Sequence, residues 1–316
     1  MEYKSITTTT GFSNEKITQL RESLKDICNS NNSICVVTVG SFARGEASHQ
    51  SDIDFYLIYD DLKDLDMKDV ESTCDNIKEI IEQSGIRMPS PTGAFNEVVK
   101  RSEFLENIGG NNDLNESLTR RMLFLLECKW LCNQSSYETL YEKIIHKYVK
   151  DTITQHQMCR FLLNDIIRYY RTMCVDFEYK TTEAGKSWGD RNIKLMFSRK
   201  LIYFSGILVV AETVQHTWLS KRNILKNSFY NTPIERIENI CGNKSNKMLG
   251  MYDEFLDAMS RTEIRDMLNA TTDDRSTHNE EFRTLKNKGH HFSLELSKLL
   301  AVTYDVSHPI HRALIL

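Results

Sequence analysis

The residues best suited to chemistry are two aspartates, Asp52 and Asp54, and the glycine–serine pair Gly40-Ser41 that precedes them. Side chains alternate between the faces of a β-strand, so both aspartates point to one side while Ile53 points to the other. Two neighbouring carboxylates are costly unless a divalent cation neutralises them. A glycine lets the backbone approach a ligand, and a serine with the following N–H groups can hold a phosphate. This combination predicts nucleotidyl transfer.

The elements expected around these residues alternate between helix and strand, as judged from apolar spacing. In chain order they are a helix over 13–29, strands over 34–39 and 52–59, a helix over 67–83 and a strand over 94–99. Ser13 is the expected N-cap of the first helix, and Gly85 is the expected stop of the second. The turn at Gly40 therefore follows directly on a β-branched strand, and the aspartates open the next strand.

From residue 108 onward, the apolar spacing predicts helices throughout. The expected helices cover 118–131, 137–148, 158–179, 190–215, a segment that starts near Pro233, 248–268 and 291–302. Cys128 and Cys132 would then lie four residues apart on a helix. Trp188 is expected to pack between helices, and the alternative is that it stacks on a base.

The motif region resembles the nucleotidyltransferase superfamily that includes DNA polymerase β, the antibiotic nucleotidyltransferases and the PII uridylyltransferases. The resemblance is carried by Gly40-Ser41-Phe42-Ala43-Arg44-Gly45-Glu46 and Ser51-Asp52-Ile53-Asp54-Phe55, which stand in the family order. It implies an α+β fold, with a small mixed β-sheet forming a palm-like catalytic domain over residues 1–112. An all-helical domain over 113–316 would wall the cleft. The motifs do not identify a subfamily.

In this superfamily a third strand supplies a third carboxylate beside the first two. Glu97, on the expected strand over 94–99, is the choice for that position, with Glu103 and Asp113 as fallbacks. Asp52, Asp54 and Glu97 would thus be both the catalytic residues and the ligands of two Mg²⁺ ions, with Mn²⁺ as a substitute. The other interpretation of Glu97 is that it merely lies on an edge strand.

Residues of both expected domains are predicted to bind the nucleoside triphosphate; they are Gly40, Ser41, Arg44, Lys194 and Ser198. Arg44 would either contact phosphates or brace the loop against Glu46. On the expected helix over 190–215, Arg191, Lys194 and Ser198 recur at i, i+3 and i+7 and so share a stripe. A basic stripe suits triphosphate oxygens or an acidic acceptor, and the alternative is a solvated basic face.

The composition narrows the class of protein. The 316-residue chain is 40% hydrophobic and 27% charged, as globular proteins are, and its net charge of −4 argues against a general nucleic-acid binder. Its eight cysteines lie mostly inside apolar patterns, which predicts reduced, buried thiols in a cytoplasmic protein. The most apolar segment, residues 201–211, is shorter than the roughly 20 residues that span a bilayer, so no membrane contact is expected.

The sequence thus predicts a Mg²⁺-dependent nucleotidyltransferase. It would transfer a nucleoside monophosphate from a nucleoside triphosphate, with ATP expected, to a hydroxyl of a protein, a small molecule or an RNA end, and release pyrophosphate. Three alternatives stay open: a synthase of an oligonucleotide or cyclic dinucleotide signal, a non-catalytic nucleotide-binding regulatory protein, and an interaction protein whose pocket is vestigial. The intact pair of Asp52 and Asp54 weighs against the second, because a pure binder would not need both.

Overall fold

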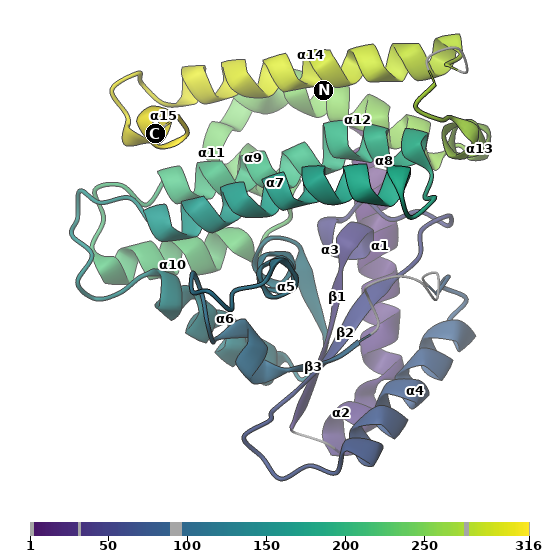
Figure 1. Ribbon diagram of the computed structural model, residues 1–316, viewed down its shortest axis with the longest axis vertical. Helices are drawn as coiled ribbons and strands as arrows, with labels where there is room; N and C mark the ends of the chain where they lie inside the picture. The colour runs from purple at the N-terminus through teal and green to yellow at the C-terminus, as the bar shows by residue number, and fades with distance from the viewer. Residues whose placement is uncertain (1–2, 31–32, 89–96, 275–277, 316) are drawn as a thin grey trace. The chain divides into compact units, whose positions relative to one another are not determined.

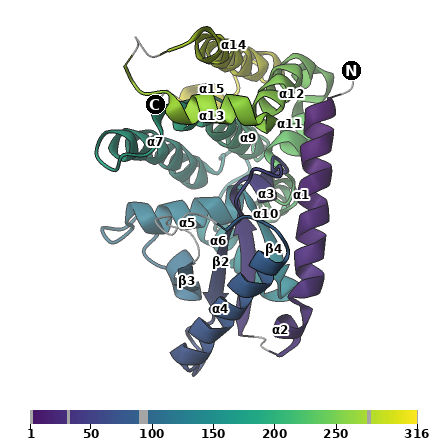
Figure 2. The same cartoon turned by 90° about the vertical axis from the view of Figure 1, so that its right-hand side faces the viewer.

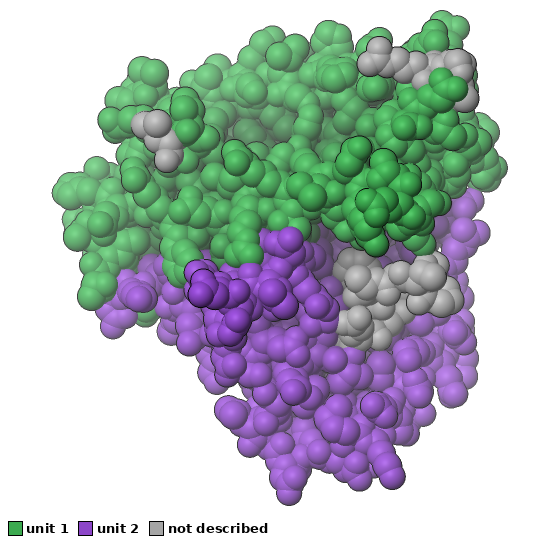
Figure 3. Space-filling model, viewed as in Figure 1, with its two compact units in different colours: residues 1–7, 152–316 green, residues 8–151 purple. Residues whose placement is uncertain are grey.

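The computed structural model of the chain describes residues 3–30, 33–88, 97–274 and 278–315. Two compact units are present, residues 8–151, here called the sheet unit, and residues 1–7 with 152–316, here called the helical unit (Figure 3). The division comes later in the chain than the expected boundary at 112/113. The reason is an unexpected strand beyond that boundary, which completes the sheet.

A mixed sheet lies at the centre of the sheet unit (Figure 1). In the described part of the chain it has the order β3-β2-β1-β4. The strands are β1 (Ile34–Val39), β2 (Asp54–Tyr59), β3 (Glu97–Lys100) and β4 (Cys128–Cys132). β1 pairs antiparallel with β2 and with β4, whereas β2 and β3 are parallel. The expected strand over 34–39 and the expected α+β fold with a small mixed sheet are confirmed; residues 94–96 of the expected third strand lie outside the described residues.

Helices cover both faces of this sheet (Figures 1 and 2). They are α1 (Lys4–Ser23), α2 (Lys25–Ser30), α3 (Gly40–Arg44), α4 (Met67–Gln83), the 3₁₀ helix η1 (Arg101–Phe104), α5 (Asn115–Leu126) and α6 (Gln134–Tyr148). The N-terminal turn of α1 belongs to the helical unit. α1 and α4 bury Leu20 and Ile77 against one face of the sheet, where Val36 and Leu57 lie. α5 and α6 pack on the strands from the other face.

The helix ends show which local signals were sufficient. α4 has the expected bounds: the Asp66 side chain accepts a hydrogen bond from the Lys68 N–H, and Gly85 follows with φ +71°. The expected start of the first helix at Ser13 is wrong, because α1 begins at Lys4. The Ser13 hydroxyl donates to the carbonyl of Thr9 and accepts from the backbone N–H of Ala47, so it serves a tertiary contact inside the helix.

β4 overturns the expected helix over 118–131. α5 ends at Leu126, Glu127 leaves the helical region with φ −151° and ψ 60°, and the next five residues form β4, which pairs with β1. Cys128 and Cys132 therefore lie on a strand. A continuous apolar run fits a buried strand as well as a buried helix, so apolar spacing alone could not distinguish the two.

Cysteine pairing also differs from the expectation. Cys132 of β4 forms a disulfide with Cys28 of α2, whereas all eight cysteines were expected to be reduced. The six free cysteines are buried apart from Cys174, which is half-buried. Burial raises the pKa of the Cys35 thiol to about 12, so this cysteine is protonated and unreactive at neutral pH.

A thiol titration of the denatured protein tests the disulfide. We expect six reactive thiols in protein unfolded without reductant and eight after reduction, because Cys28 and Cys132 are released only by the reductant. Cys28→Ser is the control and should give the same count with and without reductant. Eight thiols in the unreduced wild-type protein would contradict the pairing.

The helical unit contains the remaining helices. They are α7 (Arg160–Thr182), α8 (Trp188–Lys194), the π-helical turn η2 (Leu195–Arg199), α9 (Lys200–Ala211), α10 (Trp218–Phe229), α11 (Pro233–Cys241), the 3₁₀ helix η3 (Gly242–Ser245), α12 (Asn246–Ser260), α13 (Thr262–Ala270), α14 (Glu280–Thr303) and α15 (Pro309–Ala313). Phe197 stacks on Phe255 of α12 and packs against Phe292 of α14. No helix among the described residues is long and apolar enough to cross a membrane.

Some helix limits in this unit were predictable and others were not. Pro233 opens α11, as expected, and Thr232 and Glu235 form a capping box around it. The expected helix over 190–215 is interrupted by η2, and the expected helix over 248–268 is divided at Arg261 into α12 and α13. Extended φ and ψ angles at Arg261 (−86° and 128°) end the first of these two helices.

Candidate functional site

The sheet register brings one predicted carboxylate against the predicted phosphate-binding turn. Val39, the last residue of β1, pairs with Asp54, the first residue of β2. Gly40 follows with φ +73°, and a Cβ atom on it would lie only 2.8 Å from Oδ2 of Asp54. Position 40 therefore requires glycine for two reasons: its backbone is left-handed, and the Asp54 carboxylate occupies the space that a Cβ atom would need.

Asp52 lies on the same side of the extended segment as Asp54. Exposure alternates along the segment: Asp52 is exposed, Ile53 is buried in the core and Asp54 is half-buried. The Ile53 N–H donates to the carbonyl of Arg87 at 2.9 Å, so the segment is held in place just before β2 begins. Within the described residues the Asp52 carboxylate has no ion pair. Of the two carboxylates, that of Asp54 is the one seen directly against the turn at Gly40.

The turn itself is the short helix α3. No described side chain caps its N-terminus, where Val39 is the N-cap residue, and the first N–H groups of a helix have no intrahelical acceptor. At the other end Gly45, with φ +74°, donates to the carbonyl of Phe42, and Glu46 donates to that of Ser41. The N-terminal end of α3, at Gly40 and Ser41, therefore has backbone N–H groups without an intrahelical acceptor, whereas hydrogen bonds from Gly45 and Glu46 complete its C-terminal end.

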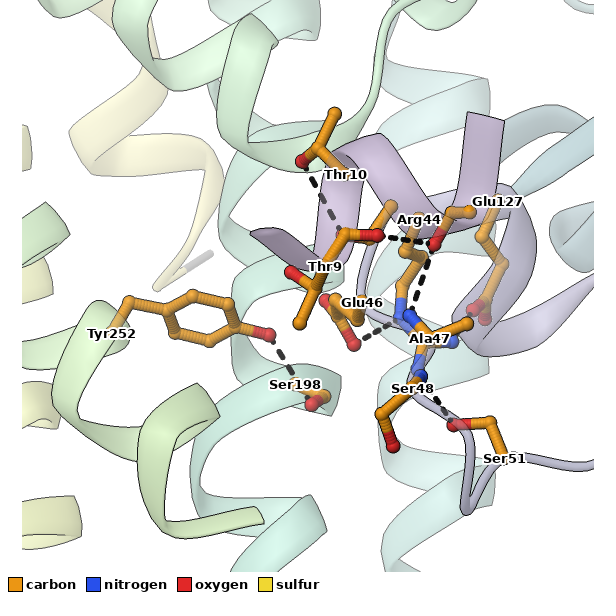
Figure 4. Close-up of polar contacts among 12 residues, drawn as sticks. Thr9, Thr10, Arg44, Glu46, Ala47, Ser48, Ser51, Glu127, Ser198 and Tyr252 are labelled. Carbon is orange, nitrogen blue, oxygen red and sulfur yellow. Dashed lines mark hydrogen bonds and ion pairs between the residues drawn. The ribbon is translucent and has the colours of Figure 1, made fainter. Parts of the chain in front are cut away.

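Helix α1 holds the loop that follows α3 (Figure 4). The Thr10 hydroxyl donates to the carbonyl of Gly45 at 3.4 Å, and the Ala47 N–H donates to the Ser13 hydroxyl at 3.1 Å. Farther along, the Ser48 N–H donates to the Ser51 hydroxyl at 3.1 Å. These hydrogen bonds position the loop that leads from α3 to Asp52.

Arg44 shows one of the two roles expected for it. Its guanidinium is buried; Nε donates to the Glu46 carboxylate at 2.8 Å, and Nη1 donates to the Glu127 carboxylate (Figure 4). Arg44 therefore braces the loop against Glu46 and links α3 to the residue before β4. A contact between Arg44 and a phosphate stays a prediction. Glu127 was not singled out from the sequence, because 83 residues separate it from Arg44 and no local motif marks the pair.

Removing the Arg44 side chain should strongly destabilise the protein. In Arg44→Ala the carboxylates of Glu46 and Glu127 would stay buried without their cation, and breaking a buried pair in this way costs about 3–5 kcal/mol of unfolding free energy. Urea denaturation of the variant and the wild-type protein measures this loss.

Arg120→Ala is the matched control for Arg44→Ala. Arg120 also pairs with two carboxylates, but those of Glu103 and Glu116 are 36% and 64% exposed. Water can solvate them once the cation is gone, so we expect a loss of at most about 1 kcal/mol. Equal losses of unfolding free energy in the two variants would show that burial of its ion pairs does not determine how much Arg44 stabilises the protein.

The third carboxylate is only partly located. Glu97 opens β3 and pairs with Tyr56, two residues beyond Asp54 on the parallel neighbour β2; its side chain lies outside the described residues. Both fallbacks are engaged elsewhere, Glu103 with Arg120 and Asp113 with the fully buried Arg121. Over the described ranges no group of three or more His, Cys, Asp or Glu side chains could hold a metal ion. Asp52 and Asp54 are therefore the described candidate ligands, and Glu97 stays a prediction.

The other two predicted nucleotide ligands belong to the helical unit. Lys194 is partly exposed and forms an ion pair with Asp190 at 2.8 Å on the same helix. Ser198 lies in the π-helical turn, is 4% exposed and accepts a hydrogen bond from the Tyr252 hydroxyl at 3.2 Å (Figure 4). Ser198 thus faces the interior, whereas Arg191 and Lys194 are partly exposed. Their contact with a nucleotide stays a prediction.

Trp188, the remaining aromatic candidate, packs inside the helical unit as expected. Its ring stacks on His278, with ring centres 5.4 Å apart, and lies 5.7 Å from that of Phe282. Gly189, the next residue, lies so close to α13 that a Cβ atom would be 2.5 Å from the carbonyl oxygen of Leu268. The position of Trp188 is therefore set by packing between α8, α13 and α14.

Comparison with known proteins agrees with the geometry of the sheet unit. Residues 22–100 match the family described as "Polymerase beta, Nucleotidyltransferase". The matched region contains the turn at Gly40, both aspartates and Glu97, which confirms the resemblance and indicates nucleotidyl transfer as the general activity. A search of curated proteins finds no match to the chain. The subfamily is not identified.

Proposed function

We propose that this chain, whose residues 22–100 belong to the polymerase β-type nucleotidyltransferase superfamily, is a Mg²⁺-dependent enzyme that transfers a nucleoside monophosphate. The donor would be a nucleoside triphosphate, with ATP expected, and the acceptor a hydroxyl of a protein, a small molecule or an RNA end. One observation carries the proposal. The carboxylate of Asp54 lies directly against Gly40, so an acidic group and a turn with backbone donors meet at one point.

The described residues fit Mg²⁺ in their chemistry. Mg²⁺ prefers hard oxygen ligands and usually binds through one or two carboxylates together with substrate phosphates. Asp52 and Asp54 supply such carboxylates on one side of an extended segment, and Glu97 is proposed as the third ligand. Two bound Mg²⁺ ions, or Mn²⁺ in their place, would neutralise the triphosphate and lower the pKa of the acceptor hydroxyl.

The protein's own part in the reaction is binding and orientation. Because Gly40 has no side chain, a triphosphate could approach the backbone of the turn, and the first N–H groups of α3 with Ser41 would hold its terminal phosphates. Arg44 and its two carboxylates keep this turn fixed on the sheet. Asp52 and Asp54 would hold the donor and the acceptor in line. Such positioning supplies much of the rate enhancement in phosphoryl transfer.

Product analysis of the purified protein tests this function. The protein is incubated with Mg²⁺ and the four nucleoside triphosphates, first alone and then with candidate protein, small-molecule and RNA acceptors. Pyrophosphate is assayed and the products are identified by mass spectrometry. Pyrophosphate release with a nucleotidylated acceptor supports the proposal, whereas release without an acceptor indicates an oligonucleotide or cyclic dinucleotide synthase. Mg²⁺-dependent nucleotide binding without pyrophosphate under any condition would overturn it in favour of a regulatory protein.

A further inference from the structure

Helix α14, drawn in yellow-green and yellow in Figure 1, borders two hollows in the helical unit. The larger, of about 660 Å³, has Glu280 and Glu281 in its wall together with charged residues of α12. The smaller, of about 330 Å³, here called the α14 pocket, is lined by His278, Arg283, Lys286 and Asn287. Among its described lining residues there is no carboxylate. Positions 283, 286 and 287 fall on one face of α14, because residues three and four apart are neighbours on a helix.

No described residue neutralises the cations of the α14 pocket. Neither the Arg283 guanidinium nor the Lys286 ammonium has an ion pair with any described residue, and the Asn287 amide has no described hydrogen bond. By contrast, Lys288 on α14 pairs with Glu254, and the nearby Lys247 pairs with Glu295, both at 2.7 Å. The chain as a whole has a net charge of −4, so this basic hollow differs in sign from the overall charge of the protein.

His278 forms the packed floor of the α14 pocket. His278 is 9% exposed, its Nε2 lies 3.0 Å from the carbonyl oxygen of Thr272, and its ring packs on Trp188 and Phe282. Because a carbonyl only accepts, Nε2 carries the proton, and Nδ1 is left without a partner among the described residues. The ammonium of Lys286 lies 5.5 Å from the centre of the Trp188 ring, so a cation–π contact holds it beside the imidazole.

We propose that the α14 pocket binds a phosphate group, either inorganic phosphate or the terminal phosphate of a larger molecule. A guanidinium donates two parallel hydrogen bonds to a phosphate, an ammonium adds a point charge, and an amide N–H adds a further donor. The purely basic and neutral lining disfavours a cationic ligand. The residues of this proposed binding site belong to the helical unit, whereas Gly40 and Asp54, where nucleotidyl transfer is proposed, belong to the sheet unit.

Calorimetric titration of the full-length protein in EDTA tests the proposal. The probes are inorganic phosphate, AMP and adenosine; EDTA removes the divalent ions on which the proposed catalytic site depends. We expect saturable binding of phosphate or AMP with a Kd of about 1 mM or below and no binding of adenosine. Arg283→Ala and Lys286→Ala should each weaken binding at least about tenfold, the loss of one charge-assisted contact. Arg283 is exposed, so its replacement leaves the fold intact.

Two control variants separate this site from the alternatives. Lys298→Ala removes an exposed charge from the same helix outside the pocket, and Asp54→Asn disables the proposed catalytic site; neither should change the affinity. AMP binding more tightly than phosphate indicates the terminal phosphate of a larger ligand, and equal affinities indicate the free anion. The proposal is overturned if neither probe binds up to about 10 mM, or if Lys298→Ala weakens binding as much as Arg283→Ala does.

Discussion

Asp54→Asn is expected to lower the turnover number for pyrophosphate release by at least about 10²-fold, the usual effect of removing a principal electrostatic group. Asparagine keeps the shape of the side chain that lies against Gly40, so the turn should stay in place. It lacks the negative charge that holds a divalent ion, and the loss should therefore appear in turnover rather than in stability. Initial rates at saturating Mg²⁺ and nucleoside triphosphate, with thermal unfolding measured in parallel, check both parts.

Asp64→Asn is the matched control for this prediction. Asp64 lies exposed in the acidic loop after β2, and the same change there removes the same charge. Its rate should equal that of the wild-type protein within about twofold, since surface charges away from a site have small effects. A near-normal rate for Asp54→Asn, or an equal loss in Asp64→Asn, would contradict the role of Asp54.

Gly40→Ala is expected to impair both folding and activity, and the second effect should be the larger. An alanine at φ +73° costs about 1–2 kcal/mol of unfolding free energy. In addition, its Cβ would stand 2.8 Å from Oδ2 of Asp54, so either the carboxylate or the turn must move. A displacement of about 1 Å at such a site can cost about 10²-fold in rate, which is the loss in turnover that we expect.

The glycine after α4 supplies the control that separates strain from displacement. Gly85 has φ +71°, almost the same as Gly40, but a Cβ atom there meets nothing within 4 Å. Gly85→Ala should therefore lose similar stability and keep its activity. If both variants keep wild-type turnover, the closeness of Gly40 to the Asp54 carboxylate has no catalytic meaning.

The sequence was sufficient to predict those parts of the site whose residues lie close together in the chain. Gly40 and Asp54 are close in the chain, and strand periodicity around Ile53 places both aspartates on one side of the segment. The bounds of α4 were readable for the same reason, because Asp66 and Gly85 act on the backbone beside them. Local signals suffice where the partners of a residue lie a few positions away.

The parts that were missed depend on partners far away in the chain. β4 is a strand because β1 offers it an unpaired edge, and Glu127 matters because α3 presents Arg44 to it. The Ser13 hydroxyl reads as a helix cap, yet its partner is Ala47, on the loop after α3. None of these contacts produces a pattern in the neighbouring residues of the sequence. Apolar periodicity and capping rules therefore predicted nothing there, or predicted the wrong element.

Ser198 shows the same limit in the helical unit. Regular helical spacing placed it on a stripe with Arg191 and Lys194, but the π-helical turn from Leu195 to Arg199 adds a residue to the local repeat. Packing of Phe197 against Phe255 and the hydrogen bond from Tyr252 accompany that turn. Such an insertion depends on the surrounding helices, and apolar spacing within one helix does not reveal it.

A crystal structure with a non-hydrolysable nucleoside triphosphate and Mn²⁺, located by its anomalous signal, tests the central claim most directly. The account predicts an ion bound by carboxylate oxygens of both Asp52 and Asp54, at about the 2.1 Å typical of Mg²⁺ ligands, with the terminal phosphates on the turn at Gly40 and Ser41. A nucleotide bound elsewhere, or an anomalous peak that touches neither aspartate, would contradict it.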